Sequence, residues 1–262
     1  YDESDQTYSL NGTKHWVTNG PSADLFTVFA NVIRRDLGNG TIPVVTAFIV
    51  ERNAPGVSIG KVEPKSGMLG LETCQVTFRD TPVHESNVIG EVGDAANVLM
   101  KTLIDDRYLT AARITAALRQ LLDFTIKHTL NRRQFNQRLC DFDAIKHKVS
   151  LMAANVYSLE SMVYMTAGLA DYQQEPDIQL ESTLAKIHAV QVSKFVTDGC
   201  LNILGSLSYL QDEPARRLSE DLRAYDFWEG TTNILKAFVA ISGLHHYSKQ
   251  QHKIKELRNP ML

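Results

Sequence analysis

Cysteine is scarce in this chain. Only three occur among 262 residues, Cys74, Cys140 and Cys200, and they are far apart and odd in number. No Cys-x-x-Cys pair and no cysteine–histidine spacing typical of zinc is present, so we expect neither structural zinc nor a disulfide framework. The histidines also lack the spacing of metal ligands, and we predict no metal site. A reducing compartment is the simplest interpretation of so few thiols.

A strong charge of one sign and long hydrophobic runs are missing as well. The formal net charge is -3 at pH 7 and the sequence pI is about 6.3, which argues against a nucleic-acid-binding protein. No apolar run is long enough to cross a bilayer. The hydrophobic content of 44% and charged content of 22% are ordinary for a globular protein, and the length allows more than one domain.

The residues before about position 94 favour β structure. Asn11-Gly12 in "TYSLNGTKHWVTNG" predicts a hairpin turn. Two runs rich in β-branched and aromatic residues, 25–33 and 44–51, predict strands on either side of a polar turn at 34–40. The alternating run "CQVTFRDTPV" predicts another strand, and "APGVSIG" and "SGMLGLET" predict turns.

The rest of the chain has helical periodicity. A long helix is expected where apolar residues recur every three or four positions, at Ile145, Val149, Met152, Val156, Leu159 and Val163. Further helices are expected over about 95–129, from 183 to a stop at Gly205, and after Glu229. A loop with Pro176 separates two of them. We therefore predict a β domain over 1–93, a four-helix bundle over 94–250 and a tail over 251–262.

One carboxylate has unusual neighbours. Glu229 lies in "YDFWEGTTNILK", after Phe227 and Trp228 and before Gly230. Aromatic walls disfavour ionisation and raise the pKa of a carboxyl group, and glycine lets another molecule approach the backbone. A tuned catalytic base fits this pattern. A carboxylate in the first turn of a helix, favoured by the helix dipole, fits it too.

Several motifs occur together in a fixed order: "LNGTKHWVTNG", "NRRQFNQRL", "LNILGSLSYLQDEPARRLSEDLR" and "FWEGTTNILK". In this combination the chain resembles the acyl-CoA dehydrogenase family over nearly its whole length. "VVTAFIVERN", "NVIGEVGDAANVLM" and "LESMVYMTAGLADYQ" are most similar to the very-long-chain branch, and within it to the relative known as a mitochondrial complex I assembly factor.

The resemblance implies an α+β multidomain fold, with an antiparallel β domain followed by a C-terminal four-helix bundle. It also implies that the sequence is an excerpt that lacks the family's N-terminal helical domain and this branch's C-terminal extension. The implied activity is FAD-dependent α,β-desaturation of long-chain fatty acyl-CoA in the mitochondrion, at the matrix or the inner membrane. The implied partners are an electron-transfer flavoprotein and a second copy of the chain in a homodimer.

The same resemblance assigns roles to single residues. Glu229 matches the catalytic base, which removes the proton α to the thioester, while its backbone N–H donates to the thioester carbonyl. Positions that contact the flavin are matched by Trp16 and Thr18, and by Thr231 and Asn233 after the base. Without the family context, these would be a core aromatic, a turn residue and helix caps.

A second group of residues is implied to serve the partner subunit's FAD. Arg132 and Phe135 match an Arg-x-x-Phe motif whose guanidinium binds the pyrophosphate; read without the family, Arg132 is an ordinary solvated charge. Asn202 and Gly205 match a Gln-Ile-x-Gly-Gly segment, but "GSLS" replaces the family's Gly-Gly-x-Gly, so weaker FAD binding is possible. Arg107 and Gly230 match positions near the substrate.

Two hypotheses stay open on this sequence. One is a flavin-dependent dehydrogenase for long-chain acyl-CoA. The other is a weakly catalytic or non-catalytic scaffold that acts with respiratory complex I assembly proteins, which the altered "GSLS" loop and the assembly-factor resemblance favour. An acyl-CoA oxidase is a poorer third option, because its motifs differ around the base.

Overall fold

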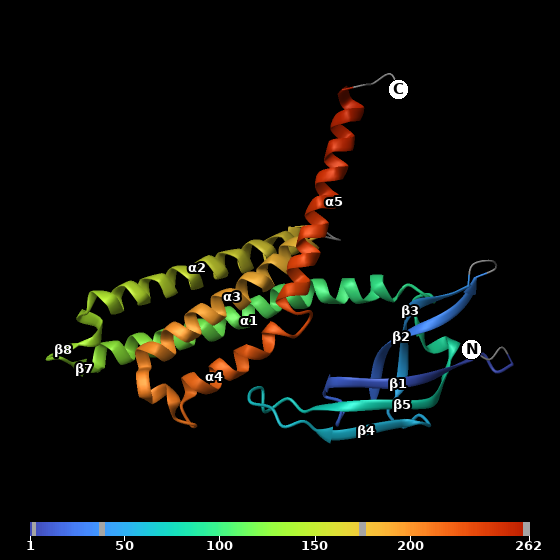
Figure 1. Ribbon diagram of the computed structural model, residues 1–262, viewed down its shortest axis with the longest axis horizontal. Coiled ribbons are helices and arrows are strands. Elements are labelled where there is room, and N and C mark those ends of the chain that lie inside the picture. Colours follow the sequence, from blue (N-terminus) through green and yellow to red (C-terminus); the bar gives the residue numbers. More distant parts are fainter. Residues whose placement is uncertain (2–3, 37–39, 173–176, 259–262) are drawn as a thin grey trace. The chain divides into compact units, whose positions relative to one another are not determined.

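The computed structural model describes residues 1, 4–36, 40–172 and 177–258, and the chain divides into two compact units (Figure 1). The first comprises residues 1–102 and is built from β-strands. The second comprises residues 103–262 and is helical. A β region followed by a helical region is the fold class expected from the sequence.

The first unit consists of two antiparallel sheets. One has the strand order β1-β5-β4 and the other the order β2-β3-β6. Buried side chains from both sheets form one core, which includes Phe26, Phe48, Val76 and Phe78. The strands are β1 (Thr7–Thr18), β2 (Leu25–Asp36), β3 (Gly40–Glu51), β4 (Val57–Val62), β5 (Thr73–His84) and β6 (Val88–Ile89), with a short 3-10 helix η1 (Glu85–Asn87) between the last two.

The hairpin expected at Asn11-Gly12 is wrong. Strand β1 continues through these residues and stays paired with β5, with a shift of register between Leu10 and Gly12. The Asn11 side-chain oxygen accepts a hydrogen bond from the Asp80 backbone N–H at 2.9 Å, and its amide donates to the Asp80 carboxylate at 2.9 Å. The asparagine therefore stabilises a bulge between two strands instead of a chain reversal.

Two other β predictions need adjustment. The segment "APGVSIG" does not only form a turn, because Val57 begins strand β4, which pairs with β5. The predicted strands 25–33 and 44–51 are confirmed within β2 and β3, but both extend further and pair up to Asp36 and Gly40. The centre of the predicted polar turn, residues 37–39, lies outside the described residues.

Among the residues that the structure describes, five α-helices form most of the second unit. They are α1 (Ala95–Asn131), which begins in the first unit, α2 (Asp143–Tyr172), α3 (Gln179–Leu204), α4 (Pro214–Arg223) and α5 (Thr232–Arg258). Short elements join them: a two-stranded ribbon of β7 (Arg133–Gln134) and β8 (Gln137–Arg138), and the 3-10 helices η2 (Leu139–Asp141), η3 (Gly205–Tyr209) and η4 (Ala224–Asp226). The predicted loop around Pro176 lies mostly outside the described residues.

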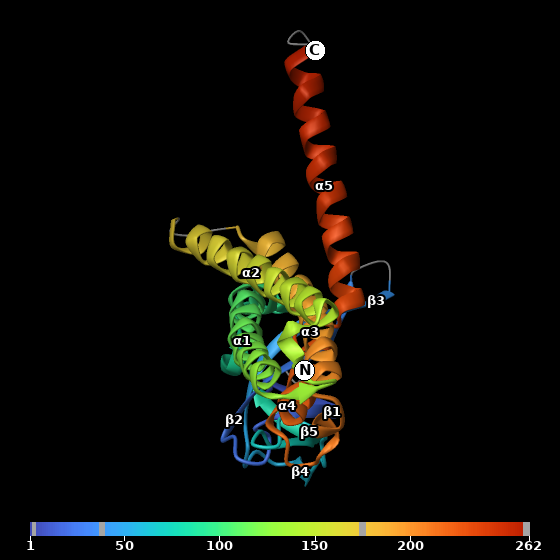
Figure 2. The same cartoon turned by 90° about the vertical axis from the view of Figure 1, so that its left-hand side faces the viewer.

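Helix α3 is the most buried helix of the second unit and contacts α2, α4 and α5. The predicted apolar face of α2 is confirmed by buried Met152, Val156 and Leu159. Helix α5 packs on α3 near its start, where Leu235 is buried, and then extends away from α1, α2 and α3 (Figures 1 and 2). Within the described residues, no helix has the length and apolar character needed to cross a membrane.

One predicted helix end is confirmed in this unit, and one helix was not predicted from the sequence. Gly205 ends α3 as predicted, with a positive φ of 61° that suits glycine, and its N–H donates to the Leu201 carbonyl. Helix α4 was not predicted. Its sequence "PARRLSEDLR" is short and strongly charged, and only Ala215 and Leu222 are buried. Packing against α3 therefore decides its structure more than its own pattern does.

Candidate active site

Glu229 lies in a tight turn between η4 and α5, three residues before that helix begins. Its backbone has a positive φ of 56°, and Gly230 follows with a φ of 103°. Residues other than glycine seldom adopt a positive φ, and such positions cluster at functional sites. Glu229 is therefore not a residue of the first helical turn, and the turn presents its side chain toward α1.

The Glu229 carboxylate is partly buried against α1. The Thr110 hydroxyl donates to both carboxylate oxygens, at 3.2 and 3.4 Å. Burial raises the pKa of Glu229, and the negative charge of Asp106 raises it further. The charge of Lys186 and the hydrogen bond from Thr110 act in the opposite direction. The net result is a raised pKa, which suits a group that accepts a proton near neutral pH.

Two buried cations from different helices lie near this carboxylate. Lys186 of α3 is only 1% exposed, and its ammonium group donates to the backbone carbonyl of Trp228 and, at 2.8 Å, to that of Gly230. Arg107 of α1 is 5% exposed and donates to the Thr183 hydroxyl at 2.8 Å. Burial lowers the pKa of Lys186 to about 8, while Glu229 acts to raise it.

Arg107 has unused hydrogen-bonding capacity in this cluster. Its guanidinium lies 5.6 Å from the centre of the Phe238 ring, which places the positive charge over an aromatic face. Its Nε atom is buried and makes no hydrogen bond. A buried donor without a partner is costly, and such donors often mark a binding position. The placement is consistent with the predicted role of Arg107 near the substrate.

The aromatic residues beside Glu229 make contacts of their own. The Trp228 ring packs edge-on against Tyr225 with 5.5 Å between ring centres. Phe227 is 57% exposed, and its ring lies 5.8 Å from the Arg223 guanidinium. Among the residues that the structure describes, the Trp228 and Phe227 rings thus interact with Tyr225 and Arg223, and a hydrogen bond to the Glu229 carboxylate comes from Thr110 of α1.

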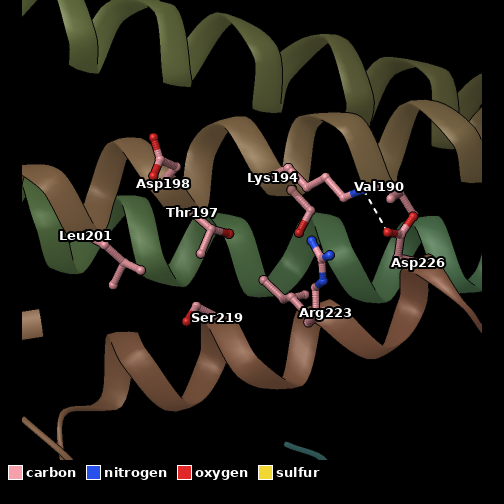
Figure 3. A pocket seen from close by; sticks show the side chains of 10 residues that line it. Val190, Lys194, Thr197, Asp198, Leu201, Ser219, Arg223 and Asp226 are labelled. Atoms are coloured by element: carbon pink, nitrogen blue, oxygen red, sulfur yellow. Dashed lines mark hydrogen bonds and ion pairs between the residues drawn. The ribbon is translucent and has the colours of Figure 1, made fainter. Parts of the chain in front are cut away.

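The start of the same turn is tied to α3 by a second lysine. Lys194 pairs with the Asp226 carboxylate at 2.7 Å, and the Thr232 hydroxyl donates to Asp226 at 2.6 Å (Figure 3). This ion pair borders a pocket of about 250 Å³ between α3 and α4, which Thr197 and Arg223 also line. Glu229 is not among the residues that line the pocket, so the pocket is separate from the candidate site.

Residues implied to contact flavin near Glu229 are exposed. Thr231 precedes α5 and accepts a hydrogen bond from the Leu235 N–H through its carbonyl, while Asn233 lies in the first helical turn. In the first unit, Trp16 is 70% exposed with a positive φ of 59°, where the pairing of β1 with β5 is irregular. The alternative that Trp16 is a core aromatic is therefore wrong. Thr18 is exposed at the end of β1.

The other predicted residues lie elsewhere on the second unit. Arg132 follows the end of α1, about 37 Å along the helix from Arg107 by the usual rise per residue. Phe135 and Asn136 form the two-residue turn between β7 and β8, both with positive φ, and Phe135 is 87% exposed. Asparagine tolerates this conformation without glycine. The Phe135 ring packs edge-on against Phe142 with 6.3 Å between ring centres, and Arg132 is exposed as well.

The altered "GSLS" segment has an ordered structure. Asn202 and Gly205 are exposed at the end of α3, and a Cβ atom at Gly205 would meet no atom within 4 Å. The Ser208 hydroxyl donates to the Gly205 carbonyl at 2.7 Å and to the Leu201 carbonyl at 3.2 Å. The side chain that replaces a glycine here is turned back onto the helix end.

Sequence reasoning missed three residues around the carboxylate: Thr110, Asp106 and Lys186. The first two are separated from Glu229 by more than a hundred residues, so no local motif connects them. Lys186 did leave a signal. It falls on the apolar stripe of α3, four residues after buried Ser182 and four before buried Val190. A lysine on a buried helical face needs a partner.

Comparison with known proteins agrees with the architecture. The family model for the acyl-CoA dehydrogenase middle domain matches residues 1–81, and that for the acyl-CoA dehydrogenase C-terminal domain matches residues 94–244. The chain is 35% identical over 256 residues to the mitochondrial very long-chain specific acyl-CoA dehydrogenase of Rattus norvegicus, covering 97% of this chain and 39% of that protein. It therefore spans much less than the full length of such relatives.

Solved structures give the same result. Butyryl-CoA dehydrogenase from Megasphaera elsdenii superposes with a TM-score of 0.83 at 30% identity, over 92% of this chain and 62% of that one. A chain in the structure of the electron transferring flavoprotein of Acidaminococcus fermentans superposes with a TM-score of 0.81 at 29% identity, over 91% and 61%. Both units match the family by sequence, and the fold agrees: this chain belongs to the acyl-CoA dehydrogenase family.

Proposed function

We propose that the protein is an FAD-dependent acyl-CoA dehydrogenase in which Glu229 is the catalytic base. The observation that carries the proposal is the placement of Glu229. Its carboxylate is partly buried, has a raised pKa, and is held by Thr110 from another helix. Family membership supplies the reaction class, the oxidation of a CH–CH bond next to a thioester.

The carboxylate's task would be to take the proton from the carbon α to the thioester carbonyl. That proton is weakly acidic, so the base needs a raised pKa and protection from water. The backbone N–H of Glu229 would donate to the thioester carbonyl and stabilise the negative charge that develops there. Gly230, without a side chain, leaves room for the acyl chain beside this group.

On the family resemblance, exposed Trp16 and Thr18 on β1 are proposed to contact the flavin ring. The same role is proposed for Thr231, just before α5, and for Asn233, in the first turn of that helix, which are exposed as well. Exposed Arg132, Phe135, Asn202 and Gly205 are suited to the diphosphate and adenosine of a partner subunit's cofactor, which makes a homodimer part of the proposal. When bound, the flavin would accept the hydride from the β carbon.

The proposed substrate is a long-chain fatty acyl-CoA, because the chain is 35% identical to very long-chain specific relatives. The proposed electron acceptor is an electron-transfer flavoprotein, supported by the likeness to a chain in the structure of such a protein. The proposed location is the mitochondrion, the location in the names of these relatives. We also propose that the β domain comprises residues 1–93 and the helical bundle residues 94–250.

Flavin bleaching tests the proposal. The intact protein should be yellow, and its flavin absorbance should bleach when palmitoyl-CoA is added without oxygen. Glu229→Gln should keep the flavin and lose the bleaching, by at least about a thousandfold in rate. Asp123→Asn is a control and should bleach normally, since that carboxylate is exposed and pairs with Lys127 of its own helix. Full bleaching by Glu229→Gln would remove the assignment of the base.

The same experiment separates the enzyme from a scaffold. A protein that is purified without flavin, and does not take up added FAD, would favour the non-catalytic role in respiratory complex I assembly. The contacts of Ser208 favour the enzyme, because this side chain hydrogen-bonds to the α3 end and leaves the exposed surface of Gly205 open. Ser206, the other serine that replaces a glycine, is exposed.

A further inference from the structure

We infer that Lys186 is a positioning residue for the candidate base: its ammonium group bridges the carbonyls of Trp228 and Gly230 and holds the left-handed turn that presents the Glu229 carboxylate. This inference rests on the proposed role of Glu229. Lys186 touches neither the carboxylate nor, in the proposal, the reacting atoms. It acts through the backbone on both sides of the base.

The burial of Lys186 needs an explanation. Lysine is almost never fully buried unless it is paired, because removing an ammonium group from water costs several kcal/mol. Lys186 is 1% exposed, and its ammonium group donates hydrogen bonds to two backbone carbonyls, not to a carboxylate. A charge kept here for the stability of α3 alone could be replaced by methionine with better packing. The two carbonyls explain why the charge is useful.

The geometry of the turn shows what the lysine does. The two carbonyls that it binds belong to the residues immediately before and after Glu229. Between them the backbone takes two successive positive φ values, 56° at Glu229 and 103° at Gly230. Such a conformation is unfavourable for a non-glycine residue and persists only where the surroundings enforce it. An ammonium group has three donors and can hold both carbonyls at once.

Lys186 is also coupled electrostatically to the base. Its positive charge lowers the pKa of Glu229, and Glu229 acts in turn to raise the pKa of Lys186, although burial leaves that value at about 8. Arg107 lowers the pKa of Lys186 and Asp226 raises it. Proton loss from Lys186 above about pH 8 removes one donor and the charge, so the turn and the Glu229 carboxylate should both respond in that range.

The test uses the intact protein with three variants. Lys186→Met removes the charge and keeps the length of the side chain, and Lys186→Arg restores a cation. Lys127→Met is the control, because Lys127 is exposed on α1 and pairs with Asp123 of its own helix, not with the turn that carries Glu229. The measurements are the rate constant of flavin bleaching at saturating palmitoyl-CoA, the Kd for palmitoyl-CoA, and the infrared band of protonated Glu229, assigned by its loss in Glu229→Gln.

Lys186→Met should slow bleaching about a hundredfold, the loss expected when a catalytic group is displaced by about 1 Å. The Kd should change less than about threefold, and the ionisation of Glu229 should move to higher pH. Lys186→Arg should recover part of the rate, and Lys127→Met should leave both the rate and the infrared titration of Glu229 unchanged. An unaltered rate and titration in Lys186→Met, or equal losses in Lys127→Met, would overturn the inference.

Two outcomes are separated in advance. If Lys186→Met does not fold, Lys186→Gln replaces it: this shorter, uncharged side chain cannot span both carbonyls, so bleaching should still slow, and an unaltered rate would overturn the inference. If the wild type shows no bleaching, the proposed function fails, but the infrared titrations still report whether Lys186 controls the Glu229 turn.

Discussion

Replacing Thr110 by valine should lower the rate of flavin bleaching at acidic pH and leave it almost unchanged at alkaline pH. The Thr110 hydroxyl is fully buried and donates to both Glu229 oxygens, at 3.2 and 3.4 Å. These bonds are longer than the usual O–H···O distance, so we assign them about 1 kcal/mol, below the usual range for a charged acceptor. The bond favours the ionised form, and its loss therefore raises the pKa of Glu229 further.

One kcal/mol corresponds to about a fivefold change in an equilibrium. At a pH well below the pKa of Glu229, the ionised fraction and the bleaching rate should therefore fall about fivefold in Thr110→Val. At a pH well above it, both enzymes are ionised and the rates should agree within about twofold. The measurement is the pH profile of flavin bleaching by palmitoyl-CoA, together with the infrared titration of the Glu229 carboxyl group.

Thr115→Val is the matched control. Thr115 is also buried on α1, but its hydroxyl donates at 2.8 Å to the Ala111 carbonyl of its own helix. The substitution removes the same hydroxyl group from the same helix without touching Glu229. A rate loss in Thr110→Val that is equal at every pH, or a shifted titration in Thr115→Val, would refute the reasoning, since either would show an effect on the fold and not on the carboxylate.

Three further predictions follow from the same cluster. Gly230→Ala should destabilise the protein by about 1–3 kcal/mol in urea unfolding, because the φ of Gly230 is 103° and a Cβ there would lie 3.1 Å from Leu235 Cδ2. Gly168→Ala, at an exposed position on α2, is the control and should not be destabilising. Asp106→Asn should lower the pKa of Glu229, since the Asp106 charge raises it; an infrared titration that moves up would contradict this. The free energy of unfolding of the wild type, relative to that of Lys186→Met, should rise by up to about 3 kcal/mol between pH 8 and 10.5. In that range the unfolded chain binds the Lys186 proton and the folded chain does not. Urea unfolding at several pH values measures this difference.

Sequence patterns predicted those elements that are determined by residues close together along the chain. The apolar stripe of α2 and the glycine stop of α3 are properties of short segments, and the structure has both. The predicted hairpin at Asn11-Gly12 is wrong because the Asn11 side chain hydrogen-bonds to Asp80 on another strand. Helix α4 was not predicted because its sequence is short and strongly charged, and it is stabilised by packing against α3, with Ala215 and Leu222 buried.

The sequence by itself determined that Glu229 stands beside a glycine in an acyl-CoA dehydrogenase motif, and it predicted which residues would contact a flavin. Only the tertiary structure showed the surroundings of that carboxylate. Burial and the Asp106 charge raise its pKa, the Lys186 charge and the Thr110 hydroxyl lower it, and these groups come from helices α1 and α3. Burial and charge act through space, and a motif records only the neighbours along the chain.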